Sequence, residues 1–298
     1  MTAPRAPLLN GLLPVYAALL GQTLISAGTY LAAKQAMGEL RPFEVVCARM
    51  LIAGVIFALM LAVLPGRALP PKRALPLICG LGLLAGPLNQ GLFFWGLAQS
   101  VPAHGALLYA LTPLGVFLYM VARRRETVSV RRAVGIGLAL VGVTVLLTGR
   151  GLAQAWGPLV GDLFILAAVA AWVLYTAEGR RLIPEFGAVR ASAWTMLAAS
   201  IFTLPFAPFV VDLERVASAS PLTWALLAYL GVLTSVVAYM LWYFALSRLE
   251  ATRVAVFSNL QPAATAIAAW LILGDPLTWE ILVGGVLVIA GVRITQRG

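Results

Sequence analysis

Charged side chains are scarce along this chain of 298 residues. Asp, Glu, Lys and Arg supply 11% of it, whereas an average soluble domain carries about 25%. This scarcity excludes an ordinary soluble domain. The net charge of +10 does not indicate nucleic-acid binding, because the basic residues lie in short loops and form no continuous basic face with interleaved aromatic side chains. We therefore expect no nucleic-acid partner.

Cysteine and histidine are rarer still, with two and one in the whole chain. Cys47 and Cys79 both lie inside apolar stretches, where cysteine packs as a small side chain, and they form neither a disulfide framework nor a C-x-x-C metal site. We expect no metal and no cofactor. An intramembrane hydrolase would need a Ser–His pair or paired aspartates at depth, which the sequence does not offer, so we do not expect an enzyme.

Long apolar runs, by contrast, fill the chain. Hydrophobic residues make up 61% of it, and about 20 consecutive apolar residues suffice for a helix to cross a membrane. The sequence predicts one all-α polytopic membrane domain, residues 1–298, that spans a lipid bilayer ten times. The expected spans are Pro14–Ala33, Val45–Leu64, Ala74–Leu97, Ala103–Ala122, Arg132–Thr148, Leu159–Ala177, Arg190–Val211, Leu222–Leu246, Thr252–Leu273 and Thr278–Thr295.

The second half of the chain repeats the first. The stretch Ala103–Gly149 matches Thr252–Gly298 without gaps, and the matches include an internal proline, Pro113 and Pro262. Such self-similarity predicts two five-helix repeats, 12–149 and 157–298. Because five is odd, the second repeat must enter the membrane from the opposite side. Inverted repeats around a central cavity are typical of secondary transporters, with the substrate near the bilayer midplane; a channel is the less favoured alternative.

Arginine and lysine in the loops predict the orientation. If the N-terminus is cytoplasmic, 16 of them fall in inner segments and 4 in outer segments. Positive residues accumulate on the cytoplasmic side of membrane proteins. Both termini are therefore expected in the cytoplasm.

Short motifs connect the chain to a known family. They are Pro42 with Arg49, Phe94-Trp95-Gly96-Leu97-Ala98 and Leu111-Thr112-Pro113 in the first half, and Tyr243-Phe244-Ala245-Leu246 and Leu260-Gln261-Pro262 in the second. In their order and duplication, the chain resembles the drug/metabolite transporter superfamily, in its ten-span EamA-type branch, and within it the YddG-type amino-acid exporters of bacterial inner membranes. The resemblance implies a basket of ten helices whose spans 1, 3, 4, 6, 8 and 9 line a cavity. It also implies export of amino acids, large neutral or aromatic ones foremost, by alternating access.

Polar and aromatic residues within the spans are the candidates for the substrate cavity. Polar groups are costly in a bilayer and mark transport pathways, whereas aromatic side chains also serve helix packing. The predicted cavity residues are Asn89, Gln90, Trp95, His104, Tyr109, Thr112, Trp172, Tyr175, Tyr239, Trp242, Tyr243, Ser258 and Asn259. Rocking of one half against the other is expected to bend the helices at Pro87, Pro113 and Pro262.

Arg49 is interpreted as structural, near the outer end of its span, where it snorkels or pairs with Glu44 or Glu39. The predicted cavity is then neutral and suits a zwitterionic amino acid. A cation exporter would want a carboxylate in the first span, and a phosphate-ester carrier a deep basic residue; exporters of other small metabolites or drugs remain the alternative. No acid lies at mid-depth, so transport is either facilitated or coupled through His104. The chain is expected to act as a monomer.

Overall fold

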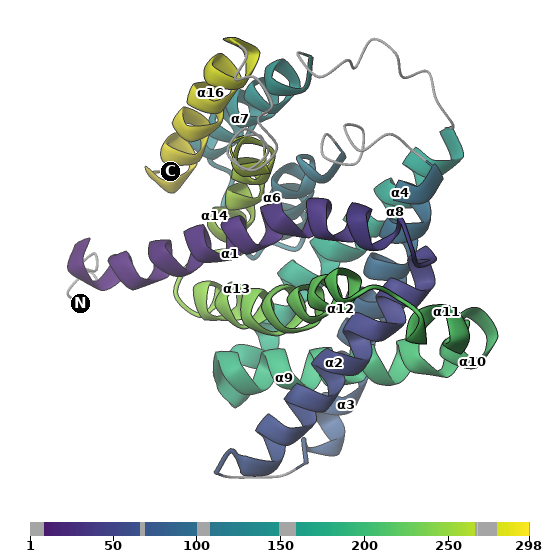
Figure 1. Cartoon of the computed structure of the whole chain (residues 1–298). Coiled ribbons are helices and arrows are strands. Elements are labelled where there is room, and N and C mark those ends of the chain that lie inside the picture. The colour runs from purple at the N-terminus through teal and green to yellow at the C-terminus, as the bar shows by residue number, and fades with distance from the viewer. Residues whose placement is uncertain are drawn as a thin grey trace.

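Every regular element that the computed structural model describes is a helix (Figure 1). The structure describes residues 9–65, 69–99, 108–148, 159–265, 267 and 279–297. Five helical stretches among them are long and apolar enough to cross a membrane. They are Leu12–Ala36, Pro42–Val63, Lys72–Gln99, Val160–Val210 and Pro221–Leu246, and a shorter apolar helix covers Thr112–Ala122. The all-helical membrane protein expected from the sequence is therefore confirmed at this level.

The first two helices are continuous and cover nearly all of the first two predicted spans. Helix α1 covers Leu9–Ala36 and α2 covers Pro42–Val63. Proline at the first position of α2 loses no helical hydrogen bond, because the first turn has no acceptor for its N–H. The carboxylate of Glu44 accepts a hydrogen bond from the Arg41 N–H at 2.6 Å, which closes the first turn.

The third helical stretch changes its hydrogen-bond pattern midway. It runs through η1 (Lys72–Ala74), α3 (Leu75–Leu83), the π-helical segment η2 (Leu84–Gly91) and α4 (Leu92–Gln99). Pro87 lies inside η2. A proline there has no N–H to donate and its ring displaces the carbonyl one turn earlier, so the helix widens locally instead of continuing with regular α-helical bonds.

The rest of the first half consists of two shorter helices. The chain makes a turn at Ala110 and Leu111. Helix α6 (Thr112–Ala122) then begins, with Pro113 in its first turn. Helix α7 follows at Val130–Thr148.

The second half opens with a helical stretch too long for one crossing. Helix α8 (Leu159–Gly179) passes through η4 (Arg180–Leu182) into α9 (Ile183–Thr203). Gly187 interrupts it with φ of 71° and ψ of 166°, a backbone conformation that side chains with a Cβ rarely adopt. The break separates the sixth and seventh predicted spans.

After α9 the chain passes through three short elements and returns in a second π-helical stretch. The short elements are η5 (Leu204–Phe206), α10 (Ala207–Val210) and α11 (Leu213–Ala217). The return comprises α12 (Pro221–Ala228), π-helical η6 (Tyr229–Val237) and α13 (Ala238–Leu246). The described chain ends with α14 (Ala251–Ala255), the 3₁₀ segment η7 (Val256–Leu260), residues 261–265 and 267, and α16 (Trp279–Arg297).

Glycines bring α7 and α16 into close contact at the top of the view in Figure 1. A Cβ on Gly135 would lie 2.8 Å from the Gly291 carbonyl oxygen, and one on Gly142 would lie 2.7 Å from the Gly284 carbonyl oxygen. Small residues let transmembrane helices approach in this way. Glycine at these positions therefore accounts for the close packing of the two helices.

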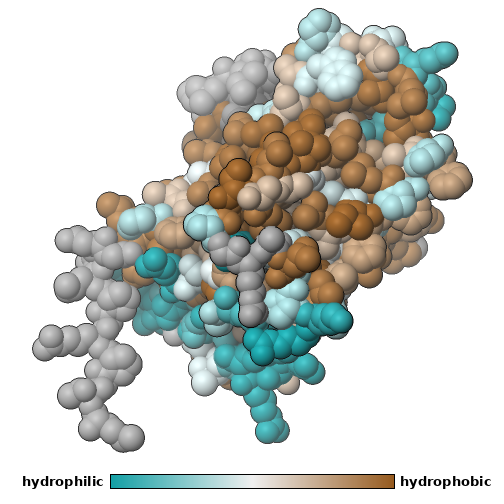
Figure 2. Space-filling view, turned by 90° about the horizontal axis from the view of Figure 1, so that it is seen from below, coloured by the Kyte–Doolittle hydropathy of each residue, from teal (hydrophilic) through white to brown (hydrophobic). Residues whose placement is uncertain are grey.

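The outer surface is strongly apolar. Figure 2 shows one broad hydrophobic face, with hydrophilic side chains gathered mainly at its edges. Large side chains that are more than half exposed include Leu24, Leu59, Leu118, Ile201, Phe206 and Leu282. Exposed apolar area on this scale is what a bilayer covers.

Candidate functional site

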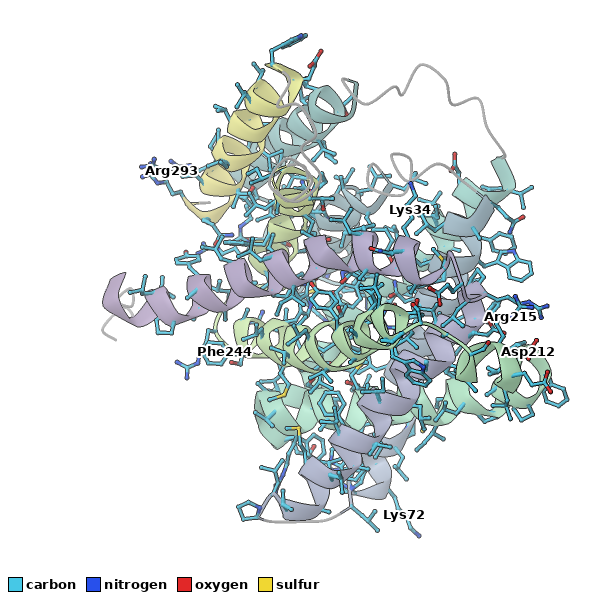
Figure 3. The ribbon with its side chains drawn as sticks, in the orientation of Figure 1. Lys34, Lys72, Asp212, Arg215, Phe244 and Arg293 are labelled. Atoms are coloured by element: carbon cyan, nitrogen blue, oxygen red, sulfur yellow. The ribbon has the colours of Figure 1, made fainter. Side chains whose placement is uncertain are left out.

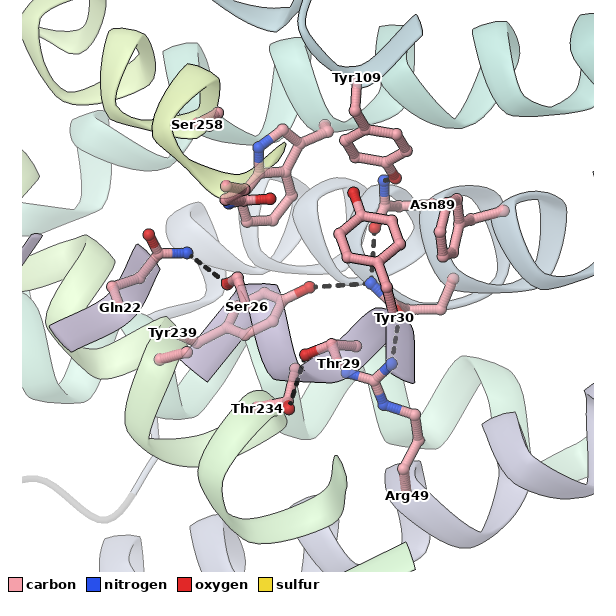
Figure 4. A pocket seen from close by; sticks show the side chains of 15 residues that line it. Gln22, Ser26, Thr29, Tyr30, Arg49, Asn89, Tyr109, Thr234, Tyr239 and Ser258 are labelled. Carbon is pink, nitrogen blue, oxygen red and sulfur yellow. Dashed lines mark hydrogen bonds between the residues drawn. The ribbon is translucent and has the colours of Figure 1, made fainter. Parts of the chain in front are cut away.

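A polar cavity lies among α1, α2, η2, α8, η6, α13 and η7, within an otherwise apolar helix bundle (Figure 4). Its volume is about 90 Å³, several times the roughly 10–15 Å³ that one water molecule requires. Its lining comprises Gln22, Ser26, Thr29, Tyr30, Arg49, Asn89, Gln90, Phe93, Tyr109, Trp172, Thr234, Ala238, Tyr239, Ser258 and Gln261. The cavity thus combines one cation, neutral polar groups and aromatic rings.

Arg49 of α2 is the charged group of the cavity, although its side chain is only 1% exposed. Its Nε donates to the Ser235 Oγ at 3.0 Å, and its NH1 donates to the Gln90 Oε1 at 2.7 Å. The guanidinium also lies 5.7 Å from the centre of the Phe94 ring. Arg49 is therefore held between the two π-helical segments, since Gln90 belongs to η2 and Ser235 to η6.

The π-helical geometry explains how Ser235 comes to bind Arg49. In such a segment a backbone carbonyl loses its usual partner four residues later. The Ser235 Oγ donates to the Leu230 carbonyl, five residues earlier, at 2.9 Å. The same oxygen accepts the Arg49 Nε–H, so the irregular helix and the buried charge stabilise each other.

Asn89 and Gln90 extend this network across the cavity. The Gln90 Nε2 donates to the Asn89 Oδ1 at 2.6 Å and lies 3.3 Å from the Tyr239 hydroxyl. The Asn89 Nδ2 donates to the Tyr109 hydroxyl at 2.8 Å and to the Ala168 carbonyl at 2.9 Å. We call Arg49, Asn89, Gln90, Tyr109 and Ser235 the arginine network. It joins elements of both halves of the chain.

The predicted snorkelling of Arg49 and its predicted pairing with Glu44 or Glu39 are wrong. Both proposed carboxylate partners are engaged elsewhere: Glu44 accepts from the Arg41 and Asp212 N–H groups, and Glu39 accepts from Ser220. Arg49 forms no ion pair in the described part of the chain, and its hydrogen-bond partners there, Ser235 and Gln90, are neutral. An unpaired buried charge is costly, so proteins keep one in a membrane mainly where it functions.

A second group of predicted residues forms a ring cluster, which we define as Trp172, Tyr175, Tyr239, Trp242 and Tyr243. The Trp172 ring centre lies 5.4 Å from those of Tyr175 and Trp242, and 5.5 Å from that of Tyr239. Trp172 and Tyr239 reach the cavity, whereas Tyr175, Trp242 and Tyr243 are fully buried behind it. The predicted aromatic residues of α8 and α13 therefore meet, but most of the cluster packs against itself.

Six predicted residues line the cavity together. They are Asn89, Gln90, Tyr109, Trp172, Tyr239 and Ser258.

Thr112 and Asn259 were also predicted to line the cavity. Both are fully buried, and neither belongs to its lining. The Thr112 hydroxyl and both polar atoms of the Asn259 amide have no hydrogen-bond partner in the described structure. His104 was also predicted there and lies outside the described residues.

Trp95 does not reach the cavity, contrary to its prediction. Its side chain is 44% exposed and packs 5.4 Å, between ring centres, from Phe43. Together with Arg41 and Phe209 it borders a separate groove on the outside of the bundle. Trp95 comes two residues after Phe93, which lines the cavity, so the regular helix α4 turns it about 200° away from that face.

The three proline positions coincide with helix irregularities. Pro87 lies inside η2, Pro113 begins α6 after the turn at Ala110 and Leu111, and Pro262 follows the 3₁₀ segment η7. These are places where backbone bonds are already interrupted. Bending during transport stays a prediction.

Sequence reasoning missed part of the lining. Tyr30 and Phe93 are a ring pair at 5.8 Å, and the hydroxyls of Thr29 and Thr234 lie 3.0 Å apart across the two halves. Thr29 and Tyr30 follow Gln22 and Ser26 at helical spacing on α1, a polar stripe that could have been found by periodicity. Arg49 could also have been predicted as a cavity residue, because it is a charged residue within an apolar run.

The cavity carries no acidic side chain among the described residues. Nor does the described part of the chain bring together three or more His, Cys, Asp or Glu residues in a way that could hold a metal ion. The site is thus positive overall, because Arg49 stands opposite neutral hydroxyl and amide groups. Its chemistry is that of binding a small molecule with an anionic end.

Comparison with known proteins agrees with the helical fold. A solved crystal structure superposes with a TM-score of 0.76 at 20% identity, over 94% of this chain and 98% of the other. An uncharacterized transporter of Archaeoglobus fulgidus is 28% identical over 91% of this chain and 93% of its own. A probable terminal-alkyne amino-acid exporter of Streptantibioticus cattleyicolor is 27% identical over 84% of this chain and 82% of its own.

The model of one family matches the chain twice, over residues 12–148 and 159–296. These two stretches cover nearly all of it and coincide with the halves that enclose the arginine network. The polar cavity in an apolar bundle and the likeness to transporters lead to the same conclusion: the chain belongs to the EamA-like transporter family.

Proposed function

We propose that the protein is a bacterial inner-membrane secondary transporter that exports amino acids by alternating access. The observation that carries the proposal is the polar cavity closed by both halves: Arg49 and Asn89 come from the first, Trp172 and Tyr239 from the second. A site between two repeats is where such carriers bind their substrate.

Helix irregularities at matching places support two inverted repeats. An offset of 149 residues brings η2 into overlap with η6 and the turn at Ala110 and Leu111 onto the end of η7. The same offset relates Gly135 to Gly284 and Gly142 to Gly291. In the structure Gly135 lies against Gly291, and Gly142 lies against Gly284. A two-fold axis between antiparallel helices produces this crossed pairing. On this basis we propose ten spans in two opposed five-helix halves.

Ion pairs and related contacts support the proposed grouping of the segments on the two sides of the membrane. Glu39 contacts Ser220, and Glu44 contacts Asp212 and Arg215. All of these residues lie in segments that are expected outside. The ion pairs of Arg73 with Glu185 and of Arg132 with Glu250 join segments expected inside. Lys34 and Arg215 lie toward one end of the molecule and Arg293 toward the other (Figure 3). Both termini are proposed to be cytoplasmic.

Amino acids are the proposed substrate because the cavity offers a guanidinium for a carboxylate and rings for an apolar side chain. The amino-acid exporter among the relatives supports the same class. Without an acid in the described lining, the flow is proposed to be facilitated, or coupled through His104. Neither a catalytic role nor a second subunit is required.

Reconstituted protein tests the function. Proteoliposomes loaded with labelled phenylalanine, leucine and alanine should release at least one of them faster than protein-free liposomes, and a pH gradient should leave the plateau unchanged if the flow is uncoupled. Concentrative transport that survives His104→Ala contradicts both proposed driving forces. Cysteines placed at Arg124 and Arg215 should label from opposite sides; labelling from the same side contradicts the inverted repeat.

A further inference from the structure

Arg49 has donors that the protein does not use. An arginine side chain carries five N–H donors, and two protein bonds engage the Arg49 Nε and NH1. The NH2 nitrogen has no hydrogen-bond partner in the described structure, and it is not fully buried. It therefore faces the cavity, as the guanidinium does in Figure 4.

Ser235 and Gln90 fix the plane of this guanidinium. Ser235 binds the Nε–H and Gln90 binds an N–H of NH1, so the planar guanidinium has little rotational freedom left. A carboxylate can then accept from two N–H groups at once, which gives both strength and direction. Neither neighbour supplies negative charge, so the compensating anion has to come from the ligand.

The groups around the remaining space offer an ammonium no negative charge. Ser26, Thr29, Thr234, Ser258 and the amide of Gln22 offer neutral oxygen atoms, and the described lining has no carboxylate. Thr29 and Thr234 already bond to each other at 3.0 Å, and Ser26 accepts from Gln22 at 2.8 Å. A net-neutral zwitterion would leave its positive end without a charged partner.

We propose that Arg49 binds the carboxylate of the transported molecule and that this carboxylate, rather than an ammonium group, defines the substrate class. The inference rests on the proposed transport through this cavity. The class is small carboxylates with an apolar or aromatic body, N-acylated amino acids included. Tyr30, Phe93 and Trp172 supply ring faces for that body.

Three matched probes test the proposal on the full-length protein. L-Phenylalanine has both charged groups, N-acetyl-L-phenylalanine keeps only the carboxylate, and L-phenylalaninamide keeps only the ammonium. Binding is measured by the rise in unfolding temperature with probe concentration, and export by release from proteoliposomes. Both carboxylates should bind, and the amide should bind on the order of ten- to a hundredfold more weakly, as expected for loss of hydrogen bonds to a charged group.

Substitution then assigns the preference to Arg49. Arg49→Gln should reduce the difference between the acid and the amide to within about threefold, and Arg49→Lys should keep part of it, since the charge remains and the fork is lost. Arg215→Gln, in the partly exposed outer segment, is the matched control and should leave the preference unchanged. If Arg49→Gln does not fold, the wild-type probe series and Arg49→Lys still decide.

The outcomes separate this inference from the proposed function. Equal binding and export of phenylalanine and its amide overturn the carboxylate inference and leave amino-acid export standing. Binding of phenylalanine without N-acetylphenylalanine shows that the ammonium is required, which also overturns it. If none of the three probes binds or is exported, amino-acid export and the carboxylate inference are both contradicted. An unchanged preference in folded Arg49→Gln shows that another group reads the carboxylate.

Discussion

The arginine network and the ring cluster lie side by side and share the cavity wall, yet they differ in what holds them. In the network, hydrogen bonds of 2.6–3.0 Å join Arg49, Gln90, Asn89 and Ser235. In the ring cluster, aromatic centres lie 5.4–5.7 Å apart, and the Trp242 Nε1 and Tyr243 hydroxyl have no hydrogen-bond partner in the described structure. Polar groups turn toward the cavity, whereas most of the rings turn toward each other.

The comparison teaches that aromatic side chains in a span are weaker evidence for a site than one buried cation. A ring gains dispersion and ring–ring contact from any well-packed neighbour, so it needs no ligand. A guanidinium without an anion gains nothing comparable from packing. Substitutions in the two groups should therefore separate stability from transport.

Trp242→Ala should have the largest effect, and it should act on stability. The side chain is fully buried, so its removal leaves a void, which typically costs about 3–5 kcal/mol for a tryptophan. We expect a clearly lower unfolding temperature in detergent, while the export rate per folded molecule stays within about threefold of wild type. Trp242→Phe should show a smaller loss of stability. Normal stability with abolished export would show that Trp242 contacts substrate after all.

Gln90→Leu should come next and act on transport. The change removes the acceptor that fixes Arg49 and the donor to Asn89, and a lost bond to a charged group is worth about 1.5–3 kcal/mol. Export should fall on the order of ten- to a hundredfold. Gln99→Leu is the control from the same helical stretch, since Gln99 is exposed and its hydrogen bond within the described residues goes to the Trp95 carbonyl. Equal export by the two variants would contradict the network's role.

Trp95→Ala and Trp172→Ala form a pair that tests the corrected placement. Trp172 lines the cavity, so its loss should weaken the binding of phenylalanine about tenfold, within the range measured for buried ring contacts. Trp95 borders the outer groove, so its loss should leave binding nearly unchanged. Titration of the probe against the unfolding temperature measures both. The reverse order of effects would restore Trp95 to the cavity.

Glu39→Gln should give the smallest effect, far from both groups. Hydrogen bonds from the Ser220 N–H and hydroxyl lower the pKa of the Glu39 carboxyl below its ordinary value of 4.5. A lowered folded-state pKa adds stability above the unfolded pKa, and this stability is lost as the pH falls through the folded value. Wild type should therefore unfold at a slightly higher temperature than the variant at neutral pH. The difference should shrink as the pH falls below the ordinary pKa and vanish once it lies below the lowered pKa of the folded state; a difference that persists after both forms are protonated would exclude this carboxylate as its source.

Much of this protein follows from the sequence alone. The apolar runs determine that it is helical and lies in a membrane, because an unpaired backbone cannot enter lipid. Pro87 and Pro262 predict interrupted helices, and the costly mid-span Asn89 and Gln90 predict polar groups turned away from lipid. Small residues at Gly135 and Gly142 likewise predict close helix packing. Each of these inferences depends on a local property of the chain and on the solvent around it.

Only the tertiary structure decided which side chains meet. Arg49 and Ser235 are far apart in sequence, and their contact depends on how η2 and η6 depart from a regular helix. The structure also places Trp95 on the other side of α4 from the cavity-lining Phe93, two residues earlier and about 200° around a regular helix. Glu44 and Glu39, close to Arg49 in sequence, instead found partners near residues 212–220 in the second half. Sequence spacing measures distance along one helix, whereas the charge of a cavity depends on which helices face each other.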